Sequence, residues 1–96
     1  MDDVNTISLY QALAEMRKLT AMGRTFSFTH VTYNRHQGST NGIRQVRKAR
    51  LRPAAKDDDV VNSQYKLFYY EEDSQQPRNC WQMLILFFNG KKVVLD

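Results

Sequence analysis

The amino-acid sequence predicts an α+β fold in which one N-terminal helix packs on a five-stranded antiparallel meander sheet. Two patterns predict it. Apolar residues recur at helical spacing near the N-terminus, and from residue 25 onward apolar and polar residues alternate in segments separated by turn-forming residues. The connections are short, so consecutive strands are expected to pair as neighbours. The expected elements are a helix at about 9–22 and strands at about 25–33, 43–52, 65–70, 79–88 and 91–95.

Length and composition favour a single domain over residues 1–96. The chain has 96 residues, of which 42% are hydrophobic and 25% charged, close to a typical globular mix. Its one cysteine, Cys80, permits no internal disulfide, which fits a reducing compartment. The N-terminus lacks the pattern of a secretory signal, and no apolar run approaches the roughly 20 residues of a bilayer span. We therefore expect a cytoplasmic protein that does not act at a membrane.

The segment 5–23 carries the signals of a complete helix. Ser8 followed three residues later by Gln11 forms a capping box at its start. Gly23 suits the left-handed residue that closes a helix. Between these ends, one apolar stripe at spacings of three and four consists of Leu9, Ala12, Leu13, Met16 and Leu19.

The first two strands follow from β-branched and aromatic content. Residues 25–33 alternate aromatic side chains with threonine and serine, which favours a strand. In residues 43–52, Ala49 and Leu51 share one parity with Ile43 whereas Val46 has the other, a break that indicates a β-bulge. Between these strands, residues 34–42 have the composition of a loop.

The last three strands end in a strong hairpin signal. Residues 65–70 form the third strand, and residues 79–88 the fourth. Asn89-Gly90 then favours a tight turn, because both turn positions need positive φ. The fourth strand is apolar at both parities, and a single helix covers only one face of a sheet. Strong sheet curvature or a second copy of the chain would cover the other face, so a homodimer is one expectation.

Recognisable catalytic and metal-binding patterns are missing from the sequence. His30, His36 and Cys80 lack the paired spacings of metal ligands. The triplet Asp57–Asp59 lacks the alternate spacing, the glycine and the terminal glutamate of a calcium loop. Paired carboxylates, a phosphate-cradling glycine loop and a nucleophile elbow are also missing. We therefore expect no catalytic residues, no metal, no cofactor and no small-molecule substrate. In the ordinary interpretation, Cys80 is a buried thiol and the two histidines lie on the surface.

A basic strand is the sharpest chemical feature. The candidate polyanion-binding residues are Arg44, Lys48, Arg50 and Arg52, which share one parity, with Arg35 and Arg47 close in sequence. Residues of one parity lie roughly 7 Å apart along a strand, near the phosphate spacing of a single nucleic-acid strand. Four tyrosines would offer stacking planes if they fall on the same face: Tyr33, Tyr65, Tyr69 and Tyr70. The alternative is a solvated outer strand whose charges meet Asp57–Asp59 and Glu71–Asp73.

The polar loop after the first strand is a candidate partner-binding loop. Its candidate contact residues are Asn34, His36, Gln37 and Asn41. Ordinary disorder at a loop tip explains the same composition.

Three stretches together resemble small proteins encoded in prophages and other mobile elements of Bacteroidetes-type bacteria. They are SLYQALAEMRKL at 8–19, NGIRQVRKARLRPAAK at 41–56 and CWQMLILFFNGKKVVL at 80–95. The resemblance implies a genomic setting and carries over no functional residue. The leading expectation is a non-enzymatic interaction or accessory protein of phage or mobile-element type, acting on a protein partner or as a homodimer through its loops and basic strand. The alternative is a nucleic-acid-binding accessory protein whose basic strand contacts phosphates.

Overall fold

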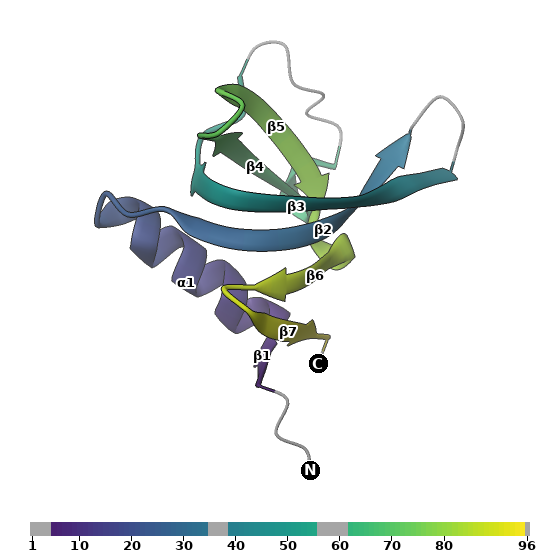
Figure 1. Cartoon of the computed structure of the whole chain (residues 1–96), viewed down its shortest axis with the longest axis horizontal. Helices are drawn as coiled ribbons and strands as arrows, with labels where there is room; N and C mark the ends of the chain where they lie inside the picture. Colours follow the sequence, from purple (N-terminus) through teal and green to yellow (C-terminus); the bar gives the residue numbers. More distant parts are fainter. Residues whose placement is uncertain (1–4, 35–38, 56–61, 96) are drawn as a thin grey trace.

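The computed structural model describes residues 5–34, 39–55 and 62–95. Within these residues the chain forms one α-helix and a seven-stranded mixed sheet, so the α+β class is confirmed (Figure 1). The helices are α1 (Leu9–Ala21) and two short 3₁₀ turns, η1 (Ser63–Tyr65) and η2 (Gln82–Leu84). The strands are β1 (Thr6–Ser8), β2 (Phe26–Asn34), β3 (Ser39–Leu51), β4 (Lys66–Glu71), β5 (Gln76–Trp81), β6 (Ile85–Phe88) and β7 (Lys91–Val94).

The N-terminal helix begins and ends where its signals predict. The Ser8 hydroxyl accepts a hydrogen bond from the backbone N–H of Gln11 at 3.1 Å, which satisfies one of the unpaired amides of the first turn. At the other end Gly23 has φ +74°, and the N–H of Arg24 donates to the carbonyl of Leu19 at 2.8 Å. These are the bonds of a glycine C-cap, so both ends of α1 are determined locally.

The five-stranded meander prediction is wrong in strand number and in order. The sheet order is β1-β7-β6-β2-β3-β4-β5. Only β2 to β5 form a meander; the chain then returns to the far side of β2, where β6 pairs antiparallel with it. β1 adds a strand that the sequence analysis missed, and it pairs parallel with β7.

The predicted strand at 79–88 is two strands that belong to different parts of the sheet. β5 ends at Trp81, η2 turns the chain, and β6 begins at Ile85. At the turn, the side-chain amide of Gln82 donates to the carbonyl of Lys66 at 3.0 Å. The apolar residues at both parities therefore belong to two strands that pair with different neighbours. They do not form one flat strand whose second face needs to be covered.

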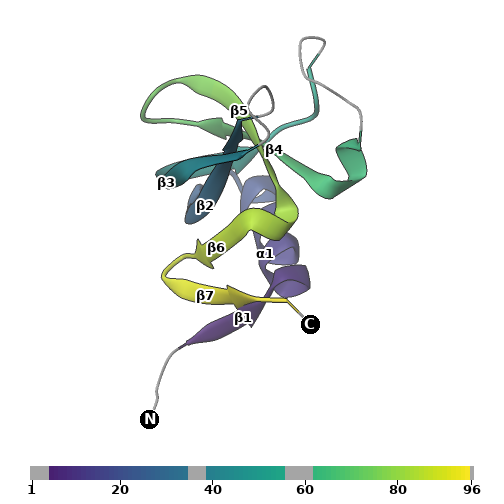
Figure 2. The ribbon, with the colours of Figure 1, turned by 90° about the vertical axis from the view of Figure 1, so that its right-hand side faces the viewer.

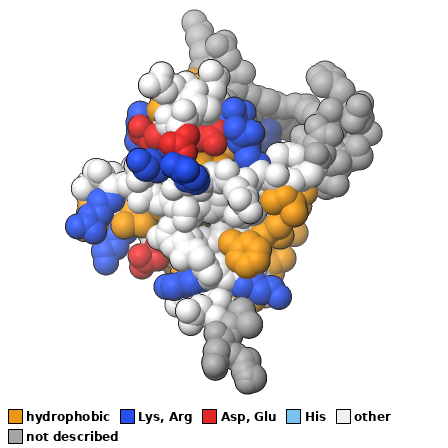
Figure 3. Space-filling view, viewed as in Figure 1, with side chains coloured by type: hydrophobic (Ala, Val, Ile, Leu, Met, Phe, Trp, Pro, Cys, Tyr) orange, Lys and Arg blue, Asp and Glu red, His pale blue; other side chains and the backbone are white. Residues whose placement is uncertain are grey.

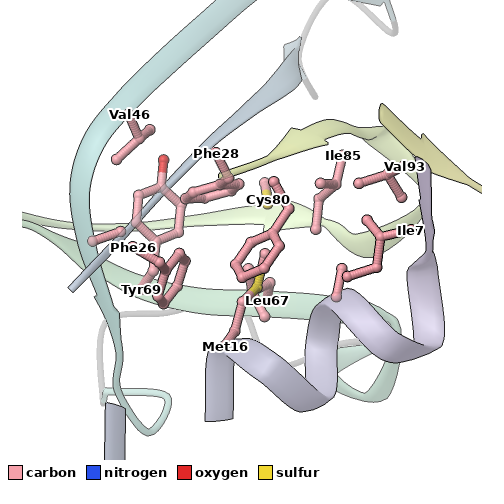
Figure 4. Close-up of a cluster of buried hydrophobic side chains, with 13 residues drawn as sticks. Ile7, Met16, Phe26, Phe28, Val46, Leu67, Tyr69, Cys80, Ile85 and Val93 are labelled. Atoms are coloured by element: carbon pink, nitrogen blue, oxygen red, sulfur yellow. The ribbon is translucent and has the colours of Figure 1, made fainter. Parts of the chain in front are cut away.

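The sheet curls, and α1 packs against its inner side (Figures 1 and 2). β4 and β5 bend over, and β5 contacts β2 as well as β4. The helix contacts β1, β3 and β7. The hydrophobic core fills the space enclosed by these elements (Figure 4), and its buried members are Ile7, Ala12, Met16, Phe26, Phe28, Val46, Ala49, Leu67, Tyr69, Cys80, Ile85, Phe88 and Val93.

A bulge in β3 changes which face its cations occupy. Phe26 pairs with Ala49 and Phe28 with Val46, so two residues, Arg47 and Lys48, stand opposite Ser27 alone. The predicted bulge is therefore confirmed. Because of the bulge, Val46 and Ala49 both face the core although three positions separate them in the sequence.

The remaining bounds differ modestly from the prediction. β2 extends to Asn34 and β3 begins at Ser39, so the described residues of the predicted loop at 34–42 lie in strands. The turn at Asn89-Gly90 is confirmed, with φ of 48° and 83°.

Candidate functional site

The predicted basic strand does not present its cations on one face. Arg44 pairs with His30 across the β2–β3 ladder, and Arg50 pairs with Tyr70 across the β3–β4 ladder. Because the bulge shifts the alternation, Arg44 lies on the inner face with Val46 and Ala49, whereas Arg50 lies on the outer face. The expectation of one continuous row of cations is therefore wrong, and the basic strand supplies two separate sites.

The outer face of β3, β4 and β5 carries three stacked cation–aromatic pairs. The Cζ of Arg50 lies 4.5 Å from the centre of the Tyr70 ring. The Cζ of Arg52 lies 5.7 Å from the centre of the Phe68 ring. The third pair is formed by Lys66, whose Nζ lies 5.0 Å from the Trp81 ring. We call this surface the cation–aromatic face: Arg50, Arg52, Lys66, Phe68, Tyr70 and Trp81.

Strand geometry explains why these side chains line up. Lys66, Phe68 and Tyr70 alternate along β4, so they project from the same side at intervals of about 7 Å. All three are partly exposed, whereas the residues between them face the core. Trp81 joins from β5, where it pairs with Lys66. The sequence analysis singled out Tyr70 but missed Lys66, Phe68 and Trp81, although the alternation in residues 65–70 contained the signal.

Acidic residues of the β4–β5 turn meet the cations of β3. Arg50 Nε donates to Glu72 at 2.8 Å, and Arg47 Nε lies 3.2 Å from Asp73. Figure 3 shows basic and acidic side chains side by side over β3 and this turn. Both pairs are substantially exposed, so each contributes little to stability. The alternative of internal neutralisation by residues 71–73 is thus partly confirmed, and Asp57–Asp59 lie outside the described residues.

Arg52 is held more firmly than its neighbours. Its Nε donates to the carbonyl of Tyr69 and its Nη2 to the carbonyl of Arg78, both at 2.9 Å. The guanidinium therefore bridges the backbones of β4 and β5 and keeps a fixed place on the cation–aromatic face. Lys48 is exposed at the bulge.

On the inner face, two arginines converge on one buried carboxylate. Arg44 Nη2 and Arg78 Nε donate to Oε1 of Glu71 at 2.7 and 2.6 Å, and the Ser74 hydroxyl donates to the same oxygen at 2.8 Å. The Glu71 side chain is 8% exposed. Burial alone would raise its pKa, but the hydrogen bonds from Arg44, Ser74 and Arg78 outweigh burial, so the pKa is lowered.

His30 is buried beside this group, not on the surface as the sequence analysis expected. Its Nδ1 donates to the carbonyl of Val31 at 3.1 Å, so in the neutral ring Nε2 accepts from the Tyr69 hydroxyl at 2.9 Å. Burial lowers the pKa of His30, which keeps the ring neutral, and burial raises the pKa of the Tyr69 hydroxyl. One end of the core is therefore polar and hydrogen-bonded, with His30 and Tyr69 next to the Glu71 group. We call it the polar end of the core.

The structure describes only some of the other predicted site residues. Arg35, His36 and Gln37 lie outside the described residues, and Asn34 and Asn41 fall within β2 and β3. Cys80 is buried, and burial raises its pKa to about 12. In the described part of the chain, no group of three or more histidine, cysteine or acidic side chains is placed to hold a metal ion.

Comparison of the chain with family models, with curated proteins and with solved structures finds no match. The resemblance to mobile-element proteins therefore stays a prediction. Among residues 5–34, 39–55 and 62–95, every helix is too short or too polar to cross a bilayer.

Proposed function

We propose that this protein is a non-enzymatic binding module and that its ligand is single-stranded nucleic acid, held on the cation–aromatic face. The observation that supports the proposal is the alternation of three cations with three partly exposed aromatic rings over β3, β4 and β5. Proteins that bind single strands without sequence preference combine a basic track for phosphates with rings on which bases stack. Arginine adds to this because its planar guanidinium stacks as well as carrying charge.

The acidic neighbours lower the affinity of this face without blocking it. Glu72 is 39% exposed and Arg50 is 48% exposed, so their ion pair sits in a high-dielectric environment. A phosphate competes with such a pair at little cost. Three contacting cations are few, so binding should be weak and only moderately salt-dependent.

The test is the binding of a fluorescein-labelled oligonucleotide, followed by anisotropy across a salt series. Three phosphate contacts predict a log–log slope of affinity against salt of about −2, from about −0.7 for each phosphate. Trp81 is the only tryptophan of the chain, so quenching of its fluorescence on binding reports stacking directly.

Matched variants distinguish binding at the cation–aromatic face from attraction by the net positive charge of the protein. Tyr70→Ala should weaken binding by roughly five- to 150-fold, because stacking on one ring contributes about 1–3 kcal/mol. Tyr10→Ala, at an exposed tyrosine of α1, should leave affinity unchanged. Arg50→Gln should reduce the salt slope by about one contact, whereas Arg17→Gln on α1 should not. Equal affinities for all four variants, or no binding by the folded protein at low salt, would refute the proposal.

A protein partner, including a second copy, is the second candidate. The observation that favours it is a hydrophobic area over η2 and β6 (Figure 3), where Met83 is 68% exposed and Phe87 44% exposed. If two copies associate through this area, light scattering should show a mass that rises with concentration, and Phe87→Ser should abolish the rise. A constant monomer mass would remove the homodimer.

A further inference from the structure

A pocket of about 290 Å³ opens beside the polar end of the core and borders the cation–aromatic face at Trp81. It forms where β5 bends toward β2, so its walls come from strands that are far apart in sequence. The polar lining includes His30, Thr32, Arg44, Arg78 and Cys80. Pro77 and Trp81 add apolar surface.

The pocket contains an excess of positive charge. Arg44 and Arg78 each keep about a third of their side chain exposed, at 34% and 33%, and both donate to the single carboxylate of Glu71. His30 contributes no charge, because burial lowers its pKa and keeps the ring neutral. A guanidinium has five N–H donors, so each arginine retains donors beyond its bond to Glu71.

One of these donors is unsatisfied. The Nε of Arg44 is buried and has no hydrogen-bond acceptor among the described residues. Buried polar atoms in proteins nearly always have a partner, and a charged donor without one is costly. Because the Nε atom is itself buried, an anion in the pocket would meet the exposed part of the Arg44 side chain, which is about a third of it.

We propose that this pocket binds a small oxyanion, a carboxylate or a phosphate group, through Arg44 and Arg78. The guanidinium fork matches both groups, because two parallel N–H donors fit two oxygens of one anion. Glu71 accepts one donor from each guanidinium, Nη2 of Arg44 and Nε of Arg78, so both arginines are positioned before the ligand arrives. This anion site is separate from the proposed nucleic-acid contacts of Arg50 and Arg52, and the two share only Trp81.

The test is a titration of the ¹⁵N-labelled full chain with sodium phosphate and, separately, sodium acetate at constant ionic strength. The expected result is saturable movement of the backbone amide signals of residues 30–32, 44 and 78–80. The anion with the lower dissociation constant identifies the group. Movement of signals at Arg50 and Arg52 alone, or no saturable movement with either anion, would overturn the proposal.

Variants connect the binding to the two arginines. Arg44→Gln should weaken binding about tenfold or more, in line with the loss of one charge-assisted hydrogen bond. Arg44→Lys keeps the charge but not the two parallel donors, so its anion affinity should lie between those of the wild type and Arg44→Gln. Both variants should retain the wild-type spectrum elsewhere. Thr32→Leu narrows the pocket without touching Glu71 and should also weaken binding, so the test does not depend on the arginine variants folding. Unchanged affinity in the folded Thr32→Leu and Arg44→Lys proteins would count against the site.

Arg50→Gln distinguishes this site from the proposed nucleic-acid face. It should lower oligonucleotide affinity and leave anion affinity unchanged. A parallel loss of both activities in Arg50→Gln would mean that the anion binds on the outer face, which would refute the pocket assignment.

Discussion

Replacing Glu71 with glutamine tests the polar end of the core most directly. Glutamine has nearly the same shape and keeps a carbonyl acceptor, but it removes the charge that Arg44 and Arg78 share. Both arginines stay charged in the variant, so each bond keeps part of the about 1.5–3 kcal/mol that a hydrogen bond to a charged group contributes. Two such bonds, at 2.7 and 2.6 Å, are weakened together. Their combined weakening should lower the free energy of unfolding by about 2 kcal/mol.

The neighbouring residue provides the control. Glu72→Gln makes the same chemical change at a carboxylate that is 39% exposed, so it should cost no more than about 0.5 kcal/mol. The assay is urea unfolding at pH 7, followed by Trp81 fluorescence. With an m-value of about 1 kcal/mol per molar urea, the midpoint of Glu71→Gln should fall by about 2 M while m stays constant. Equal midpoints for the two variants would refute the claim that burial makes the Glu71 network strong.

Acid should weaken the same network in a defined direction. The folded-state pKa of Glu71 lies below its ordinary value of 4.5, so its contribution is complete above that pH. The contribution is lost as the pH falls through the folded-state pKa, because the unfolded chain takes up the proton first. Glu71→Gln should therefore remove part of the loss of wild-type stability below pH 4.5.

Three further predictions concern His30, Ser8 and Cys80. The pKa of His30 is lowered from 6.5 by burial, so wild-type stability should decrease as the pH falls from 6.5 toward the folded-state pKa, and in unfolding experiments at pH 7.5 and 5.5 the His30→Gln protein should lose less. Ser8→Ala removes the acceptor for the Gln11 N–H and should cost about 1 kcal/mol, seen by circular dichroism as a fall in Tm of about 4–8 °C; an unchanged Tm would mean that the cap contributes nothing. Because burial raises the pKa of the Cys80 thiol to about 12, a thiol reagent at pH 8 should label the native protein far more slowly than the protein in urea, and equal rates would contradict its burial.

Local signals in the sequence determined the elements whose energetics are local. The ends of α1 follow from Ser8 and Gly23, and the tight turn at Asn89-Gly90 follows from backbone conformations that few residues adopt readily. The bulge in β3 was visible as a change of parity between Val46 and Ala49. At the helix ends and the tight turn, the decisive interactions lie within a few residues, so the sequence alone was enough to predict them.

Tertiary structure decided the strand order and the composition of both candidate sites. The segment 79–88 is apolar at both parities, and nothing local distinguishes one long strand from two strands joined by η2; the choice depends on Gln82 reaching Lys66 and on β6 pairing with β2. Whether Arg44 shares a face with Arg50 depends in turn on the core that accepts Val46 and Ala49 on the same side. The contact of Arg44 with Glu71 spans 27 residues of chain. Alternation predicts which side chains share a face within one strand, but only the packing of the whole sheet determines which strands lie side by side.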